Sequence, residues 1–263
     1  ATMAGHGAWA AENEVVPEKA LINGVEKEAV ITGTKYTFGN NGDTAVFGNG
    51  ETDYGLAANS YVSPLDVNVL GKDISITGKF RAVYATWQVK KDDKVTVNIG
   101  NENTESILLN QTGGLDPNGS SALTILDKGT TANVTAKKIK IVSNGTYAVN
   151  SSGLDDTQDT KTVLTLKGDS IEVQNTATEG VGLAAYSGGT LNVEGNLVVT
   201  ADHAIEARGN SILNINKDGK HTTVLNGDVV IGTPGGPKSG KTLDTKLTLN
   251  LTGEGSSWTG NLI

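Results

Sequence analysis

The sequence predicts an all-β protein, a right-handed single-stranded parallel β-helix with three short strands in each rung. Three observations support this fold class: a composition rich in β-branched residues, a repeating unit of strands and corners, and no helical segment inside any repeat. The 263 residues include 32 Thr, 24 Val and 15 Ile, whose side chains fit a pleated strand better than a helix. The 24 Asn and 34 Gly residues supply the backbone freedom that tight turns require.

The composition also narrows the functional classes. The chain has a net charge of −8 and only two arginines, so it lacks the positively charged surface that nucleic-acid binding requires. Because the chain has no Cys, it has neither a disulfide framework nor a thiolate metal site. No stretch reaches the ~18 consecutive apolar residues of a membrane-spanning helix. We therefore expect no direct membrane insertion of this chain.

The first repeated element is a triplet in which Asn stands between two aliphatic residues. Because side chains alternate along a strand, the aliphatic residues face one side and the Asn faces the other. The pattern therefore predicts strands with an aliphatic inner face and an outer ladder of Asn and Thr. The triplets lie at residues 67–69, 97–99, 191–193, 213–215 and 249–251.

The second repeated element is a glycine corner followed by another short strand. Each corner reads apolar-x-Gly-polar and is followed by two alternating aliphatic residues, and glycine permits the sharp change of direction. We expect these corners to be equivalent positions of successive rungs. They lie at Gly71, Gly168, Gly195 and Gly227.

A third strand closes each unit and leads into a polar turn. One full turn starts at Leu191 and the next at Leu213, a period of 22 residues. A unit of ~20–30 residues is typical of solenoids, and about nine or ten rungs at ~4.8 Å would form a rod roughly 45 Å long. The closing strands are predicted at residues 82–85, 147–149, 181–184 and 204–207.

The sequence divides into two regions. Residues 1–40 lack the repeat and are predicted to form an N-terminal extension or cap, with a weak helical tendency at 26–29. Residues 41–263 are predicted to form the parallel β-helix. Residues 8–10 resemble a signal-cleavage site with no hydrophobic segment before it, so the first ten residues are expected to be either a trimmed native start or vector-derived. Because the repeat still runs at Ile263 and a solenoid needs a cap at each end, we expect a fragment of a longer protein.

The last segments carry a family resemblance. Residues 247–252 form an apolar-Asn-apolar strand, and residues 256–262 contain a Ser-x-Trp-x-Gly segment centred on Trp258. Together with the acidic, Cys-free, Thr- and Asn-rich character of residues 40–263, they resemble bacterial autotransporter passenger domains of the AIDA-like adhesin type. The resemblance implies type V secretion across the outer membrane to the bacterial cell surface, by a C-terminal translocator that this chain does not contain.

We therefore expect a cell-surface adhesin or self-association module, with a role in biofilm formation or virulence, that binds through a long repetitive polar face and is not an enzyme. Its partner would be a host or bacterial surface glycan or protein, or a second copy of the chain, and no cofactor is expected. A passive stalk is an open possibility. The alternative is a carbohydrate-active β-helix enzyme, a polysaccharide lyase or hydrolase, which needs two or three convergent carboxylates.

Candidate residues for that alternative lie at the glycine corners. Asp169, Asn196 and Asp228 follow three of the corner glycines and would stack about 5 Å apart if the corners are equivalent. One of the three is an amide, and no Arg lies in the same corner. We therefore interpret them as ordinary turn residues.

Two sets of potential metal ligands are present. The acidic segment 155–159 could bind Ca²⁺ through carboxylate oxygens, but its spacing does not match an EF-hand, and a solvated loop is the simpler interpretation. His6, His203 and His221 show no two-ligand spacing on a shared strand. We assign no metal site.

Three further motifs have an ordinary structural explanation. Residues 235–242 match the formula of a phosphate-binding loop, but a strand pattern follows where a helix is required. Phe80, Tyr84 and Trp87 could form a stacking platform for sugars or a contact patch, although packing under a loop or a cap is the simpler interpretation. The glycosylation triplet at 144–146 would matter only in a eukaryotic secretory host.

Overall fold

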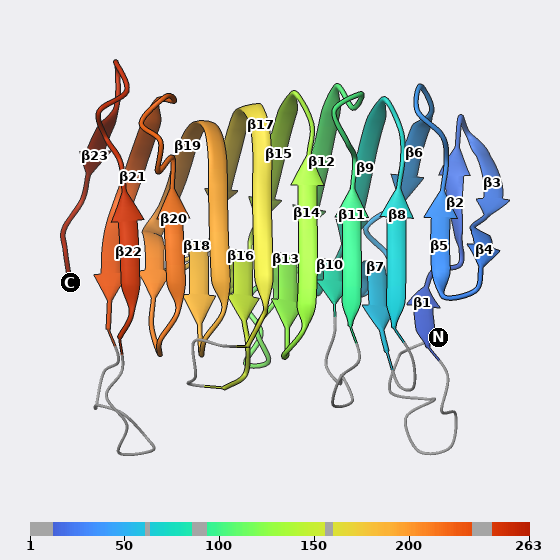
Figure 1. The fold of residues 1–263 in the computed structure, drawn as a ribbon, viewed down its shortest axis with the longest axis horizontal. Helices are drawn as coiled ribbons and strands as arrows, with labels where there is room; N and C mark the ends of the chain where they lie inside the picture. Colours follow the sequence, from blue (N-terminus) through green and yellow to red (C-terminus); the bar gives the residue numbers. More distant parts are fainter. Residues whose placement is uncertain (1–12, 61–63, 86–93, 156–159, 233–243) are drawn as a thin grey trace.

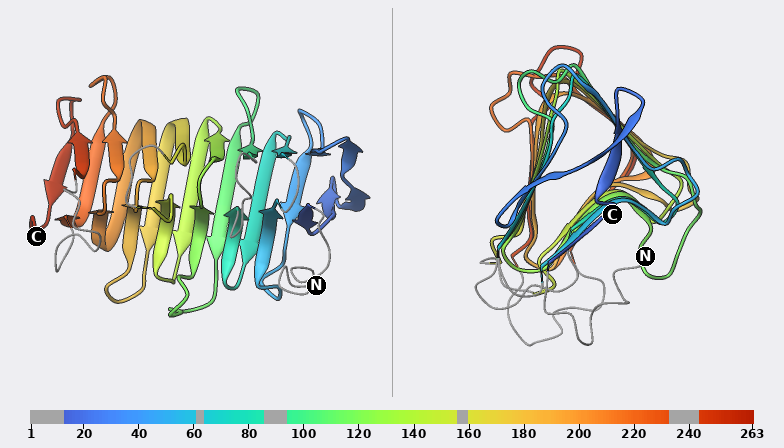
Figure 2. Two further views of the ribbon diagram at one scale, coloured as in Figure 1. Left: turned by 60° about the horizontal axis from the view of Figure 1, so that its bottom comes forward. Right: turned by 90° about the vertical axis from the view of Figure 1, so that its right-hand side faces the viewer.

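The computed structural model describes residues 13–60, 64–85, 94–155, 160–232 and 244–263. In these ranges the secondary structure consists of 23 β-strands, which coil around one long axis (Figure 1). The cross-section of the coil is triangular (Figure 2, right), and each of its three walls is a stack of parallel strands. The predicted parallel β-helix is therefore confirmed. Within the same ranges we find no helix that is long and apolar enough to cross a bilayer.

The first wall, stack A, faces the viewer in Figure 1. Seven successive parallel pairings join its eight strands, so the described chain contains eight rungs. Stack A contains β5 (Lys35–Phe38), β8 (Leu65–Val69), β11 (Val95–Ile99), β14 (Thr130–Thr135), the first parts of β17 (Val163–Asn175) and β19 (Thr190–Ala207), β20 (Ile212–Ile215) and β22 (Lys246–Leu249).

The second wall, stack B, lies behind stack A, and the third wall, stack C, closes the triangle (Figure 2, right). Stack B contains β6 (Thr44–Phe47), β9 (Asp73–Gly78), β12 (Ser106–Gln111), β15 (Lys138–Ser143), the later parts of β17 and β19, the first part of β21 (Thr223–Ile231) and β23 (Ser257–Thr259). Stack C contains β7 (Tyr54–Asn59), β10 (Arg81–Ala85), β13 (Ser121–Leu126), β16 (Tyr147–Ser152), β18 (Val181–Tyr186) and the ends of β19 and β21.

The coil is right-handed. In Figure 1 the strands of the front wall run upward and those behind run downward, while the chain advances from the N-terminal end on the right to the C-terminal end on the left. The eight rungs are fewer than the nine or ten expected. The reason is that loops lengthen some rungs: the equivalent residues Asn98 and Asn133 are 35 positions apart, whereas Asn192 and Asn214 are only 22 apart.

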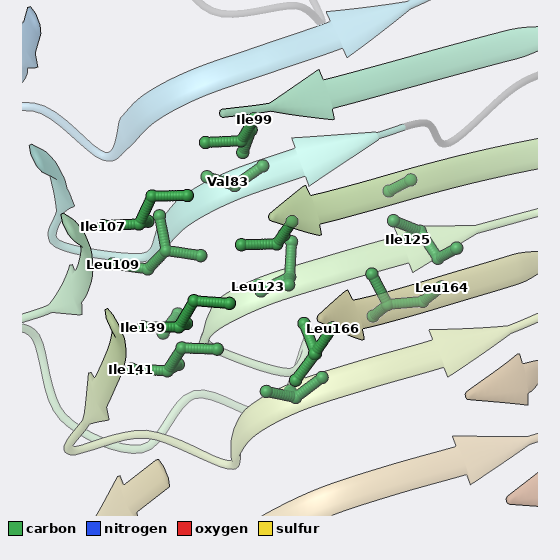
Figure 3. Packing of buried hydrophobic residues seen from close by; sticks show 14 of the residues in the cluster. Val83, Ile99, Ile107, Leu109, Leu123, Ile125, Ile139, Ile141, Leu164 and Leu166 are labelled. Atoms are coloured by element: carbon green, nitrogen blue, oxygen red, sulfur yellow. The ribbon is translucent and has the colours of Figure 1, made fainter. Parts of the chain in front are cut away.

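One continuous aliphatic core fills the axis. Most inward positions on the three walls are occupied by Val, Leu, Ile or Ala, stacked on the same position of the next rung (Figure 3). Leu191 pairs with Leu164 on one side and with Leu213 on the other, and all three are fully buried. The predicted register between Leu191 and Leu213 is therefore confirmed. Burial of these rows supplies the main driving force for coiling.

Antiparallel strands cover the first rung. These strands are β1 (Glu14–Val16), which pairs with β7, and β2 (Lys19–Ile22), which pairs with β6 and with β3 (Val25–Glu28); β4 (Val30–Thr32) pairs with β5. The predicted helical tendency at 26–29 is wrong, because Glu26 to Glu28 pair along β2. Under this cover the rings of Phe38 and Phe47 meet edge to face, with their centres 4.9 Å apart. Large rings fit here because the first rung is stacked on another rung on one side only.

Two expected equivalences fail. Gly227 lies between the stack B and stack C parts of β21, whereas Gly71, Gly168 and Gly195 lie between stacks A and B. Both kinds of corner require glycine, because an added Cβ would lie 2.1 Å from the Gly168 oxygen at Gly195 and 2.0 Å from the Ala201 oxygen at Gly227. The glycine motif alone therefore does not identify which two stacks it connects.

The second failure concerns the fifth triplet. Thr248, not Asn250, pairs with Asn214, so residues 249–251 do not repeat the register of the other triplets. Asn250 follows the end of β22, where its Oδ1 accepts a hydrogen bond from the backbone N–H of Thr252 at 2.9 Å. This local bond is a typical Asx turn, and it explains an Asn at this position without any ladder.

Candidate functional site

The outer face of stack A carries an unbroken row of uncharged polar side chains, which we call the polar ladder. One member comes from each rung, at the central outward position of the strand, between two inward aliphatic residues. Its members are Thr37, Asn68, Asn98, Asn133, Thr165, Asn192, Asn214 and Thr248.

Side-chain amides bond to one another along the ladder. Asn98 Nδ2 donates to Asn68 Oδ1 at 3.0 Å, and Asn133 Nδ2 donates to Asn98 Oδ1 at 3.0 Å. In the second run, Asn214 Nδ2 donates to Asn192 Oδ1 at 2.9 Å. An amide suits this position because it carries a donor and an acceptor and can bond in both directions along the axis. The bonds hold the amide groups in a fixed, evenly spaced array.

The C-terminal half of the ladder borders a shallow hollow of about 500 Å³. The ladder members Thr165, Asn192 and Asn214 line it, and so do the charged residues Glu194, Lys217 and Asp218. The ladder members are half-buried rather than fully exposed, except Thr248, which is exposed. The array therefore presents polar edges to solvent on a surface that is already ordered.

We expect Asn98→Ala to lower the free energy of unfolding by about 1–3 kcal/mol, because it removes both ladder bonds of the central amide. Urea denaturation followed by circular dichroism measures this difference. Asn110→Ala is the matched control, since Asn110 is a half-buried outward residue of β12 that pairs with Thr77 and Val142 and has no amide neighbour in the adjacent rungs. Equal losses in the two variants would show that the amide bonds add nothing.

The sequence identified four ladder members by their triplets: Asn68, Asn98, Asn192 and Asn214. Asn133 was missed because Ala132 replaces one of the larger aliphatics on its flank. The three threonines were missed because Thr is frequent throughout the chain. Aligning the strands of successive rungs by their alternation of inward and outward positions, rather than by the type of residue, would have found all four.

The three corner candidates do not form one site. Ser170, not Asp169, pairs with Asn196, while Asp228 pairs with His203 on stack C, so the expected equivalence of these corners is wrong. Their oxygens serve turns: Asn196 Oδ1 accepts from the Thr222 N–H at 2.9 Å, and Asp228 Oδ1 accepts from the Asn261 N–H at 2.9 Å. This arrangement brings no carboxylate pair together at these corners.

His203 lies between two carboxylates. Its Nε2 is 3.4 Å from Glu179 Oε2, and its Nδ1 is 3.7 Å from Glu206 Oε2. Glu206 also pairs with Arg208 Nη2 at 2.7 Å, so its charge is already compensated. In the part of the chain that the structure describes, no three His, Cys, Asp or Glu side chains gather in a cluster that could hold a metal ion. His221 lies at the turn before β21, and His6 falls outside the described residues.

The other candidate segments are described only in part. Asp155 Oδ2 forms an exposed ion pair with Lys128 Nζ at 2.5 Å, which raises the pKa of the Lys128 ammonium; the remainder of the acidic segment, 156–159, lies outside the described residues. The phosphate-loop formula at 235–242 lies entirely outside them. In the triplet at 144–146, the backbone N–H of Asn144 donates to Gln111 Oε1 at 3.0 Å in the corner before β16.

The aromatic candidates take part in a different cluster from the one expected. Tyr84 is 3% exposed and stacks on Tyr54 at 5.7 Å, and Phe80 meets Tyr54 edge to face at 6.0 Å. The Arg81 guanidinium lies 4.3 Å from the Tyr84 ring centre and 4.6 Å from that of Phe80. Trp87 lies outside the described residues. Because Tyr84 is buried, this ring cannot serve as an exposed sugar platform.

Comparison of the chain with protein-family models, with curated proteins and with solved structures finds no match. The resemblance to autotransporter passengers therefore stays a prediction, and the functional argument depends on the structure.

Proposed function

We propose that this protein is a non-catalytic surface rod, an adhesin or self-association module of the bacterial cell surface, and that a second copy of the chain binds along the polar ladder. The observation that supports this proposal is the unbroken row of eight uncharged polar side chains on one wall. Two such rows have the same spacing, so they match along their whole length when two rods lie side by side.

The area of stack A is sufficient for a specific interface. Eight rungs at ~4.8 Å give a length of ~38 Å, and five residues of a strand at ~3.3 Å give a width of ~17 Å. The face therefore measures about 650 Å², or about 1,300 Å² for two rods, which is within the range of specific interfaces. Hydrogen bonds of single amides are weak, but many rods on one cell surface act together.

Bead aggregation tests this function. We expect beads coated with the protein to cluster, and beads coated with the triple variant Thr37→Asp, Thr165→Asp, Thr248→Asp to cluster at least about tenfold less. The three carboxylates would face those of the opposite rod and repel them. These threonines are chosen because the amide–amide hydrogen bonds of the ladder join only asparagines, which the variant leaves in place.

The matched control places the same three charges on stack B. Ser75→Asp, Gln174→Asp and Ser257→Asp lie at outward positions of β9, β17 and β23 and should cluster like the unmodified protein. Circular dichroism checks that both variants are folded. Dispersed beads with the unmodified protein, or equal loss in both variants, would rule out self-association through the ladder.

A further inference from the structure

The outer side of stack C contains a hollow of about 340 Å³ that no part of the polar ladder touches. Its walls come from β10, β13, β16 and β18 and from residues 117–119, which connect β12 to β13. A volume of this size is in the range of small-ligand sites. The polar and aromatic residues that line it are Arg81, Asn118, Thr146, Tyr147, Asn150 and Tyr186.

A buried amide in this hollow has an unused acceptor. Asn150 is only 6% exposed, and its Oδ1 atom is buried without a hydrogen-bond partner among the described residues. Buried polar atoms of folded proteins nearly always have a hydrogen-bond partner, because leaving one without a partner is unfavourable. Asn150 pairs in register with Thr124 and Ala184, so the small alanine side chain leaves space beside it. The free acceptor points to a ligand that donates a hydrogen bond, such as a hydroxyl.

The same hollow contains a buried cation. Arg81 is 8% exposed; its Nε donates to the Gly119 oxygen at 3.1 Å and its Nη2 to the Asn118 oxygen at 2.8 Å. These carbonyls and the rings of Phe80 and Tyr84 orient the guanidinium but carry no negative charge. No carboxylate of the described residues forms an ion pair with it. A buried charge usually has a charged partner, so this cation favours an anionic ligand.

Two aromatic rings form the remaining wall. The centres of Tyr147 and Tyr186 are 5.5 Å apart with an angle of 60° between the ring planes. Burial, together with the nearby Glu206 carboxylate, raises the pKa of both hydroxyls, which keeps the rings neutral. Ring faces of this kind pack against the C–H face of a sugar. Because Glu206 is compensated by Arg208, it adds little repulsion toward an anion.

We propose that this hollow binds a carboxylated pyranose, with the sugar carboxylate at Arg81, a hydroxyl donating to Asn150 Oδ1 and the sugar ring against Tyr147 and Tyr186. A neutral sugar would leave the guanidinium without a counter-charge, and a simple anion would leave the amide oxygen and the aromatic wall unused. The site is separate from the polar ladder and does not depend on self-association.

NMR titration of the ¹⁵N-labelled protein tests this site. The probes are a trimer of galacturonic acid and 3′-sialyllactose, which distinguish a uronate from a sialate source, with a neutral galactose trimer as the matched control. We expect one of the acids to shift the amide signals of Gly119, Asn150 and their neighbours, and to bind at least about tenfold more tightly than the neutral trimer, since hydrogen bonds to charged groups are stronger than those between neutral groups.

Two variants assign the binding to these residues. Arg81→Gln removes the charge, and Asn150→Asp keeps the size of the side chain but replaces the amide by a carboxylate, so each should weaken binding of the acid at least about tenfold. Asn150→Asp should leave bead clustering unchanged, which separates a failure of this site from a failure of the ladder. Binding of neither acid, shifts away from stack C, or equal binding of the neutral trimer would overturn the proposal.

Discussion

Leu109→Ala is expected to lower the free energy of unfolding by about 2–5 kcal/mol. Leu109 is fully buried in β12, where it stacks between Ile76 and Ile141 of the adjacent rungs. Removing its branched end leaves a cavity in the common axis that only a shift of two neighbouring rungs could fill. Urea denaturation monitored by circular dichroism measures the loss.

Leu108→Ala is the matched control. Leu108 is the preceding residue of the same strand, but it points outward, is half-buried and lies beside Ser75 and Lys140. The same truncation there should lower the free energy of unfolding by less than about 1 kcal/mol, because no interior cavity forms. If Leu108→Ala were the more destabilising of the two variants, the assignment of inner and outer faces would be wrong.

Gly195→Ala is expected to destabilise the protein to a similar extent. The free energy of unfolding should fall by about 2 kcal/mol or more. Gly195 has φ +149, and a Cβ would lie 2.1 Å from the Gly168 oxygen of the preceding rung. Strained backbone of this kind costs about 1–3 kcal/mol, and the steric clash adds to it. Thermal and urea denaturation report the change.

Gly114→Ala is the appropriate comparison for that variant. An added Cβ at Gly114 meets no atom within 4 Å, and its backbone is not in the left-handed region. We therefore expect the free energy of unfolding to change by less than about 0.5 kcal/mol, or to rise slightly because alanine lowers the conformational entropy of the unfolded chain. Equal effects of the two substitutions would mean that the corner between stacks A and B does not need glycine.

The sequence was sufficient to predict the fold class and much of the core. Alternation around Asn68, Asn98, Asn192 and Asn214 correctly separates inward from outward residues, because a side-chain period of two is a property of any strand. The 22-residue spacing between Leu191 and its equivalent was correct because that rung has no inserted loop.

Corners and loops were harder to predict. Glycine is required at both the A–B and B–C corners, so Gly227 could not be assigned to one of them from its type. Asn serves both ladders and Asx turns, which explains the misplaced Asn250. Loop length is not encoded in the repeat, and a rung of 35 residues between Asn98 and Asn133 therefore made the rung count too high.

The hollow on stack C could not be assembled from the sequence, because its residues come from separate rungs. It combines Arg81 of β10, Asn150 of β16 and Tyr186 of β18, from three different rungs, with residues 117–119 of an inserted loop. No repeat relates these side chains, since Tyr84, Thr124, Asn150 and the other outward residues of this wall differ from rung to rung. The one sequence signal was the rarity of arginine: both arginines, Arg81 and Arg208, lie on stack C or directly after it.

The central claim is that successive rungs stack in register along one axis, and a distance between the first and last rungs tests it most directly. Because the chain has no Cys, Thr37→Cys and Thr248→Cys provide two unique sites for spin labels on the polar ladder. Seven strand spacings separate them, so double electron–electron resonance should give a narrow distribution near ~34 Å. A distribution centred below ~20 Å or above ~50 Å is incompatible with seven spacings and would contradict the β-helix.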